Sequence, residues 1–501
     1  SNWSSSCILK IKVMMKTYKI TVIFISVLFW ISCDTDQLEQ NNPTQLSPET
    51  FFKNEAQVRA SVNAVYASLQ TIGSYSRNYY YMMDNMGHDN TANIQQEANK
   101  IIFLDFSFDA SSELVRAFWD SEFRGVNKAN FVIDNADRIN EIPNSLLSQE
   151  MKDKYIGEAK FLRALYYFNL VTRFGDVPLI TTIPEGGQGL PRTASEEVYA
   201  QIIADLKDAS QTLLPKTEEE NGRATRGAAY AFLGKVYLYQ ENYAEAMNAF
   251  ENVYGKYALA ENYFDNFKEE TEHGPESIFA VEYDESMPNG AFWNSDVNGE
   301  GGNESSLRGQ SYGMFDWFNA YPSDELRAEF EENDPRFDES FYTVGDTYAG
   351  GVITEISLDR PAGWRKYQNY YKRTNENLQS GINMNVIRYA DVLLMMAEAS
   401  NELGNQAQAI GYINEVRDRV DMPLLQNGLS QDEVFQAIVH ERRVELAGEQ
   451  VRFPDLVRWG LAEQELGKYG YQEGIHNFFP IPEVELNTND SINSGDQNPG
   501  Y

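Results

Sequence analysis

The stretch RGAAYAFLGKVYLYQENYAEAMNAFENVY, residues 226–254, decides the fold of this chain. Gly234 and Ala246 lie twelve residues apart in it, and small side chains at this spacing allow two antiparallel helices to approach closely. Large residues would fill the flanking grooves: Tyr230, Leu233, Tyr237 and Phe250. The pattern therefore predicts a helical hairpin.

The same spacing recurs in VIRYADVLLMMAEASNELGNQAQAIGYINEVRDRV, residues 386–420. Ala397 and Ala409 are again twelve residues apart, and large apolar residues flank them as in the first stretch. The first stretch fits the helical-hairpin repeat called TPR at nearly every signature position. Two matches at equal spacing predict an all-α scaffold of TPR-like hairpins.

Helical patterns also dominate the first half of the chain. Apolar residues recur at helical spacing from Val58 to Leu69. Three longer stretches have the same character, and Gly or Pro residues end two of them. They are residues 114–139, 154–175 and 195–214.

From about Asn262 to Gly381 the helical periodicity weakens, and Gly, Asn, Asp and aromatic residues become frequent. Long irregular segments on a rigid scaffold usually carry function. Flat aromatic rings can stack on the apolar faces of sugars while polar neighbours bond the hydroxyl groups. The ligand-binding candidates here are Trp293, Trp317 and Trp364, with core packing as the competing interpretation for each one.

A second irregular stretch, YSRNYYYMMDNMGHDNTANIQ, begins at Tyr75. It also mixes aromatic with polar side chains, so we expect it to contribute to the same kind of loop-borne site. Its ligand-binding candidates are Tyr81, Asn85 and Asp89.

The N-terminus resembles a secretory signal. Two lysines precede the apolar run ITVIFISVLFWI, residues 20–31, which is too short to span a bilayer. We expect residues 1–32 to be a signal peptide, with residues 1–13 upstream of the true translation start.

Cys33 directly follows the apolar run and would be the only cysteine of the mature chain. A lone exported thiol can stay free, form an intermolecular disulfide or carry a lipid. The position of Cys33 directly after the apolar run favours lipidation. The segment WISC resembles a lipobox, although Trp30 stands where that motif usually has Leu. Residues 33–50 would then be the lipidated cysteine and a polar tether.

The charge balance excludes one class of partner. The chain has 41 Lys and Arg residues against 75 Asp and Glu residues, a formal net charge of -34. Binding to DNA or RNA depends on basic patches that release counterions, so a polyanionic partner would be repelled. We expect no nucleic-acid function.

Motifs for metal binding and catalysis are absent or incomplete in the sequence. In VHERRVEL, Val444 occupies the position where a zinc-protease helix has its second histidine. The loop DVNGEGGNESSL from Asp296 alternates like a calcium loop, but Leu307 replaces the bidentate Glu; a non-standard calcium site there stays an alternative. No GxSxG elbow and no phosphate-binding GKS or GKT loop occurs. We therefore expect no metal, no cofactor and no enzyme activity.

The C-terminal third carries the most specific signal. HERRVELAGEQVRFPDLVRWG, residues 440–460, resembles the block ERR-x-ELA…R-x-x-DL-x-RWG of the SusD/RagB family. The ending NFFPIPEVELNTNDSINSGDQNPGY is similar to the PIP…E…N…QNPGY terminus of that family. The likeness runs from about Cys33 to Tyr501. The arginines of the ERR block can pair with acidic neighbours, so we assign the block to structure.

The resemblance implies an all-helical fold on four TPR-like hairpins, with long irregular loops carrying the ligand site. It implies a single domain over residues 51–501, with an N-terminal part of about 51–215 and a C-terminal part of about 275–501. It further implies a lipid anchor in the outer membrane, a surface facing the cell exterior, and a SusC-like TonB-dependent transporter as the partner. It implies no cofactor and no reaction.

Three functions stay distinct at this point. The first is a glycan-binding lipoprotein that delivers oligosaccharide or polysaccharide to the transporter. The second is a peptide-binding RagB-like lipoprotein of the same fold, since the helical scaffold does not distinguish the two ligands. The third is a surface glycoside hydrolase, which would need paired carboxylates whose separation the sequence does not reveal.

Overall fold

The computed structural model describes residues 51–93, 96–183, 189–287, 304–376 and 379–501. Residues 53–501 form one compact unit. Three features of the sequence lie outside the described residues: Cys33, Trp293 and the loop from Asp296 through position 303. Within the described ranges, no helix is long and apolar enough to cross a membrane.

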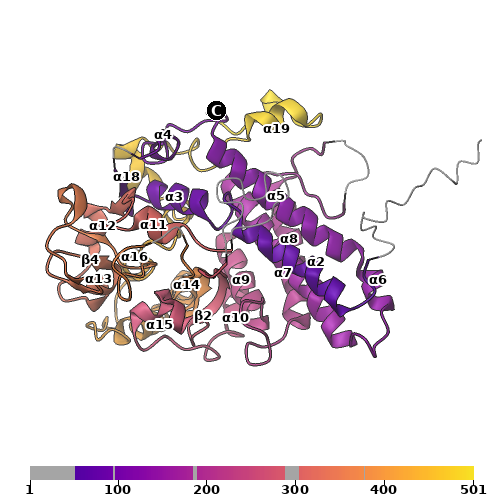
Figure 1. The fold of residues 1–501 in the computed structure, drawn as a ribbon, viewed down its shortest axis with the longest axis horizontal. Coiled ribbons are helices and arrows are strands. Elements are labelled where there is room, and N and C mark those ends of the chain that lie inside the picture. Colours follow the sequence, from indigo (N-terminus) through magenta and orange to yellow (C-terminus); the bar gives the residue numbers. More distant parts are fainter. Residues whose placement is uncertain (1–50, 94–95, 184–188, 288–303, 377–378) are drawn as a thin grey trace, which may run out of the picture. The chain divides into compact units, whose positions relative to one another are not determined.

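A continuous array of paired helices forms the scaffold (Figure 1). In the described part of the chain it contains four consecutive pairs, and each pair packs on the next. The pairs are α2 (Glu55–Ala67) with α5 (Glu113–Asp134), α7 (Gln149–Phe174) with α8 (Ser195–Thr212), α9 (Arg226–Tyr239) with α10 (Tyr243–Phe250), and α14 (Tyr389–Glu402) with α15 (Gln406–Asp418). The predicted all-α fold on TPR-like hairpins is confirmed.

The small residues of the hairpins lie where the helices meet. Ala246, Ala397 and Ala409 are fully buried. A Cβ atom on Gly234 would lie 2.3 Å from the ring of Phe250, so only glycine fits between α9 and α10. The larger residues of the signature pack around these contacts: Leu233, Tyr237 and Phe250 are buried and Tyr230 is half-buried.

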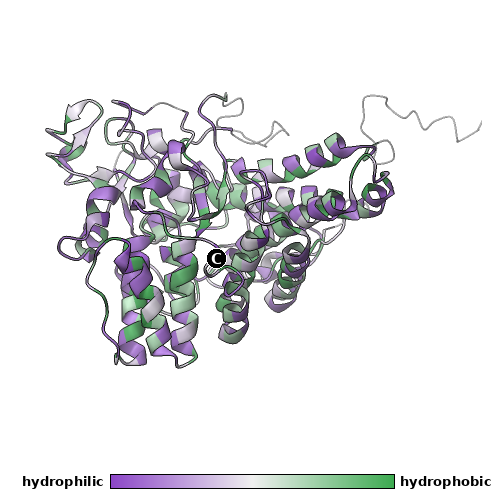
Figure 2. Cartoon of the chain, turned by 90° about the horizontal axis from the view of Figure 1, so that it is seen from below, coloured by the Kyte–Doolittle hydropathy of each residue, from purple (hydrophilic) through white to green (hydrophobic). Residues whose placement is uncertain are grey.

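Hydrophobic and hydrophilic residues alternate along most of these helices (Figure 2), as expected for helices with one face toward a core. The helix α7 differs, because buried residues occur on all of its faces, including the charged residues Lys154, Glu158 and Arg163. Each of these charges has an ion-pair partner: Lys154 contacts Glu158 at 3.0 Å and Arg163 contacts Asp205 at 2.8 Å. Pairing makes burial of charge tolerable.

Short elements fill the rest of the described chain. The strands form two-stranded antiparallel pairs: β1 (Asn90–Ala92) with β3 (Ala320–Pro322), β2 (Ser277–Val281) with β8 (Met384–Arg388), β4 (Phe341–Tyr342) with β7 (Gly363–Trp364), and β5 (Thr347–Tyr348) with β6 (Gly351–Val352). The remaining helices are α3 (Arg77–Met86), α4 (Ala98–Ile101), α6 (Ala136–Glu141), α11 (Arg308–Tyr312), α12 (Asp324–Glu329), α13 (Pro335–Ser340), α16 (Gln431–Glu445), α17 (Arg452–Arg458), α18 (Ala462–Leu466) and α19 (Glu483–Thr488).

The stretch from Tyr75 is the main correction to the sequence-based assignment of elements. It contains the helix α3, in which all ten residues are buried. The stretch combines aromatic residues with Asn and Asp, a composition typical of irregular segments, which is why the helix was not predicted.

The ERR block lies in α16 and builds buried ion pairs. Arg442 contacts Asp455 at 2.7 Å and Asp391 at 2.8 Å. Glu445 contacts Arg419 at 2.6 Å and Arg388 at 2.7 Å. The block therefore joins α16 to α14, α17 and β8 and is structural.

The QNPGY ending also has a structural role. The Asn498 side-chain amide donates to the carbonyl oxygens of Phe174 at 2.9 Å and Phe479 at 2.7 Å, and Arg192 donates to its amide oxygen at 2.7 Å. Phe174 is the last residue of α7, and terminal carbonyl groups of a helix need partners from outside it. Asn498 thus supplies a cap to α7 from 324 residues further along the chain.

Candidate functional site

Trp317 lies on a fixed turn between α11 and β3, with 36% of its surface exposed. Its backbone N–H donates to Gln310 at 3.2 Å, and that of Asn319 donates to Ser311 at 2.9 Å. The next residue, Phe318, has φ of 46°, a left-handed conformation that bulky residues rarely adopt. Such strain clusters at ligand sites and is stabilised by the surrounding structure. The turn therefore holds the Trp317 ring in a defined position.

Arg77, the first residue of α3, lies beneath this ring. Its guanidinium carbon is 5.6 Å from the centre of the Trp317 ring and 5.2 Å from that of Tyr81. Its Nε donates to the Ser311 hydroxyl at 3.3 Å. Arg77 is 2% exposed, so its charge acts on the Trp317 ring from the protein interior.

Glu97 continues the site from the start of α4. It accepts two parallel hydrogen bonds from Arg77, at 3.1 and 3.0 Å, and pairs with Lys100 at 2.6 Å. Burial raises the pKa of Glu97, but the bonds from Arg77 and Lys100 outweigh it and lower the pKa below its ordinary value. Its side chain is 46% exposed. A charged acceptor in fixed orientation is therefore accessible at this point.

Gln96, the residue before Glu97, adds an amide that has no partner among the described residues. The side chain is 6% exposed, and neither its oxygen nor its nitrogen makes a hydrogen bond with any described residue. A buried polar group without a partner costs free energy, so a ligand hydroxyl or water is expected to bind it. We call Arg77, Gln96, Glu97, Lys100 and Trp317 the Trp317 site.

The residue types of the Trp317 site suit a neutral, hydroxyl-rich ligand. The indole ring offers an apolar face, Glu97 accepts hydrogen bonds, and the Gln96 amide can both donate and accept. Glu97 is the single carboxylate of this set, and it is already held by two cations. The geometry therefore favours binding over acid–base chemistry, which needs a proton donor and acceptor around the reacting bond.

The predicted site residues divide sharply in the structure. Trp317 is exposed, whereas Trp364 is 1% exposed and donates from its indole nitrogen to Asn90 at 2.7 Å. Trp364 is therefore a core residue and offers no stacking surface, because the ring is covered by protein. Trp293 lies outside the described residues.

Tyr81, Asn85 and Asp89 are also buried and do not reach the surface. Tyr81 forms part of the floor, since Arg77 and Lys100 both lie over its ring. The Asn85 amide donates to the Lys100 carbonyl oxygen at 3.1 Å, and Asp89 accepts from the Gly448 N–H at 3.5 Å. These three residues are covered by protein and do not face a ligand from their described positions.

Sequence reasoning missed Arg77, Gln96, Glu97 and Lys100. Arg77 lies within the irregular stretch that begins at Tyr75, and Gln96 directly follows it, so the position of that stretch contains a signal for both. Glu97 and Lys100 are ordinary charged residues in sequence, and only the fold brings them beside Arg77.

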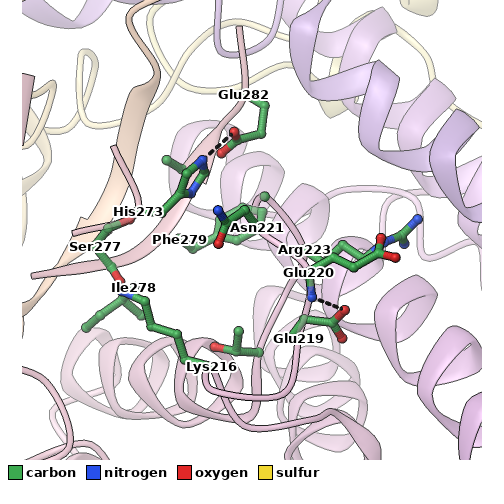
Figure 3. A pocket seen from close by; sticks show the side chains of 13 residues that line it. Lys216, Glu219, Glu220, Asn221, Arg223, His273, Ser277, Ile278, Phe279 and Glu282 are labelled. Atoms are coloured by element: carbon green, nitrogen blue, oxygen red, sulfur yellow. Dashed lines mark hydrogen bonds and ion pairs between the residues drawn. The ribbon is translucent and has the colours of Figure 1, made fainter. Parts of the chain in front are cut away.

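A separate pocket lies between the segment 216–225 and β2 (Figure 3). Its free volume of about 30 Å³ has room for roughly two water molecules. The Lys216 ammonium donates to the carbonyl oxygens of Gly274 at 2.6 Å and Ser277 at 2.7 Å, and His273 lies 3.2 Å from Glu282. Burial lowers the pKa of Lys216 to about 8. Lys216 thus joins two loops, and the pocket is too small for a sugar ring.

Models of known protein families match almost the whole of this chain. The sequence model of the SusD family matches residues 239–501, and that of a family described as "Starch-binding associating with outer membrane" matches residues 36–238. SusD-like protein P2 of Formosa agariphila is 29% identical over 530 residues, which cover 97% of this chain and 100% of that protein.

Solved structures agree with this assignment. A SusD superfamily protein from Bacteroides vulgatus has a TM-score of 0.79 and 27% identity, covering 90% of this chain and 100% of its own. A protein described as a laminarin binding SusD-like protein has a TM-score of 0.75 and 30% identity over the same shares. The family match extends over more than half of the chain, and the helical pairs and C-terminal motifs fit it. This chain belongs to the SusD family.

Proposed function

We propose that the chain captures a glycan at the Trp317 site without converting it and delivers it to a SusC-like TonB-dependent transporter. The observation that carries the proposal is the exposed Trp317 ring above Arg77, with the Glu97 carboxylate held beside it. Stacking on the ring and hydroxyl bonds to fixed polar groups together favour a sugar over an apolar ligand.

The ligand class is a neutral glucan. A laminarin binding SusD-like protein shares 30% of its sequence and its fold with this chain, and laminarin carries hydroxyl groups but no acidic groups. The net charge of -34 would repel a strongly acidic polysaccharide. Both considerations favour uncharged sugars.

The proposal includes a place in the cell. Cys33 would carry the lipid anchor in the outer membrane, and residues 33–50 would tether the compact unit on the outer surface. The family description "associating with outer membrane" supports this location. Several acyl chains on one cysteine would hold the protein stably, since a single chain binds a membrane only marginally.

The test is retardation of the soluble chain from Asp34 to Tyr501 in native gels that contain laminarin or other neutral polysaccharides. We expect the chain to be retarded and Trp317→Ala to weaken binding about tenfold or more, which corresponds to ~1.4 kcal/mol. Retention of full affinity by Trp317→Ala would place the ligand elsewhere.

The control variant is Tyr254→Ala, which removes an aromatic side chain of similar exposure, 41%, at a position outside the Trp317 site. It should leave glycan binding unchanged. Binding of a peptide mixture in place of any glycan would support a RagB-like role, and release of free sugars would show a hydrolase.

A further inference from the structure

A second groove lies between α5 and α19 and shares no residue with the Trp317 site. Its free volume is about 370 Å³, within the range of roughly 300–1,000 Å³ that is usual for small-ligand pockets. One wall is a single face of α5. The other wall consists of residues 189–190 and the end of α19. We call it the α5–α19 groove.

Aromatic rings form the apolar part of the groove. Phe123 is half-buried on the exposed side of α5 and lies 4.7 Å from the buried Trp119, measured between ring centres. Trp119 in turn contacts Phe174 edge-on at 4.9 Å, so the base is anchored in the core. Leu190, 38% exposed, borders the opposite wall. The groove therefore offers an aromatic platform of fixed orientation.

Hydrogen-bonding groups surround this platform. Asp120 and Asn127 project from the same face of α5 as Phe123, because their spacing of three and four residues brings them into line. Asn127 is exposed, and Glu485 of α19 is half-exposed opposite it. Carboxylate and amide groups on both sides of an aromatic ring match the hydroxyl groups at the edge of a sugar ring.

The wall formed by residues 189–190 and the end of α19 is held together without a ligand. The Asn489 amide donates to the Leu190 carbonyl oxygen at 3.0 Å and to Glu485 at 2.6 Å, and the Ser491 hydroxyl donates to Gly189 at 2.8 Å. A Cβ atom on Gly189 would lie 1.8 Å from the Asn489 side chain, so glycine is required for this approach. A binding site whose shape is already fixed loses little conformational entropy when it binds a ligand.

The floor of the groove is equally fixed. Ile180 exchanges two hydrogen bonds with the hydroxyl of Tyr167, at 2.9 and 2.6 Å, and accepts a third from the Asn130 amide at 2.9 Å. These bonds anchor the segment after α7 to α5 and α7.

From this geometry we infer that the α5–α19 groove is a second binding site, for a neutral oligosaccharide. The inference goes beyond the proposed function, which needs the Trp317 site alone. Two separated sites on one chain would hold a polysaccharide at two points, and the second contact would form at a high effective concentration. Asp120 and Glu485 can accept from hydroxyl groups, and Arg124 on the same side of the groove can donate to them. Two carboxylates against one arginine favour an uncharged ligand over an acidic sugar.

The experiment counts bound ligands by isothermal titration of the chain from Asp34 to Tyr501. The probes are hexasaccharides of β-1,3-glucan, β-1,4-glucan, α-1,4-glucan, mannan and xylan. We expect two equivalents of one probe on the wild-type chain and one on Trp317→Ala. We expect Phe123→Ala to remove the other equivalent and Asn127→Ala to weaken it at least threefold.

Folding is controlled separately. Phe435→Ala removes another half-buried phenylalanine, on α16, and should leave both equivalents in place. Asn127 is exposed, so Asn127→Ala tests the groove even where Phe123→Ala unfolds.

The outcomes separate this inference from the proposed function. A single equivalent that Trp317→Ala abolishes and Asn127→Ala leaves unchanged would overturn the second site and leave the proposed function intact. Binding that survives Trp317→Ala and is weakened by Asn127→Ala supports the second site. Failure of all five probes on the wild-type chain would overturn both.

Discussion

Glu122 lies on the buried face of α5, where the hydroxyl of Ser74 and the amide of Asn169 donate to it at 2.7 and 3.1 Å. Burial raises the pKa of Glu122 to about 8. The carboxyl group is therefore protonated in the folded chain at neutral pH and ionised in the unfolded chain.

This difference gives a pH dependence with a definite sign. Between about pH 4.5 and pH 8 the folded state binds one more proton at Glu122 than the unfolded state, so stability decreases as the pH rises through this window. Folding at pH 7 therefore includes the free-energy cost of protonating Glu122. Glu122→Gln removes this cost and should raise the free energy of unfolding at pH 7 by on the order of 2 kcal/mol. Urea unfolding of the wild-type chain and of the Glu122→Gln variant measures this difference.

The control for Glu122→Gln is the same comparison at pH 4. Below the pKa values of both states the difference should nearly vanish. A gain that is the same at pH 4 and pH 7 would contradict the protonated carboxyl and indicate better packing.

Two tryptophans illustrate how far single residues can be predicted. Trp317 and Trp364 stand in similar irregular sequence, yet one is exposed and the other covered by protein. Their difference depends on Asn90, which accepts from Trp364 and lies 274 residues away in the chain. Residue type alone therefore identifies candidates, while exposure is decided by distant partners.

At the scale of elements, the contact of α9 with α10 depends on Gly234. A Cβ atom there would meet the fully buried Phe250 ring at 2.3 Å, and the ring has no room to move. Although alanine favours a helix by about 1 kcal/mol over glycine, Gly234→Ala should lower stability by a net ~1–3 kcal/mol. Thermal unfolding measures the change.

Gly411 provides the matched control. It lies in α15, is exposed, and a Cβ atom there would meet no atom within 4 Å. Gly411→Ala should stabilise the chain by roughly 0.5–1 kcal/mol, because only the helix propensity changes. Equal effects of the two substitutions would contradict the close approach at Gly234.

The hairpins could be predicted from sequence because their contacts are local: twelve residues separate Gly234 from Ala246, and both helices must meet at small side chains. The helix α3 could not, because its mixture of Tyr, Asn and Asp residues is typical of irregular sequence. Complete burial is not the reason, since α7 and α14 are also buried on nearly all faces and their stretches were predicted to be helical.

At the scale of the whole molecule, buried charges connect distant parts of the chain. Glu445 contacts Arg388 at 2.7 Å, Arg419 at 2.6 Å and Arg336 at 3.0 Å, and all four side chains are buried. Burial alone would raise the pKa of Glu445, but the three arginines hold it well below its ordinary value. This residue is thus ionised and central to the network.

Glu445→Ala should lower the free energy of unfolding by about 3–5 kcal/mol, because three buried cations lose a partner. Urea unfolding checks this value. Glu325→Ala removes the exposed pair with Lys468, 3.3 Å apart, and should cost under about 1 kcal/mol. Similar costs for both variants would mean that burial does not set the strength of these pairs.

The Trp317 site itself is a property of the whole molecule. Arg77 and Glu97 are 20 residues apart, but the Ser311 hydroxyl that orients Arg77 is 234 residues away. The antiparallel pair of β1 and β3 brings these segments together. Sequence patterns report periodicity within one segment, so they cannot reveal which side chains from distant segments meet.

The cap that Asn498 places on α7 has a consequence in time. A ribosome adds roughly 5–20 residues per second, so the 324 residues between Phe174 and Asn498 take about 15–65 s to synthesise. During that interval the end of α7 and the aromatic side chains that Phe479 later covers have emerged without their partners. The end of α7 therefore acquires its cap last, and a chain truncated before Phe479 should leave these aromatic side chains uncovered, which binding of a hydrophobic dye would detect.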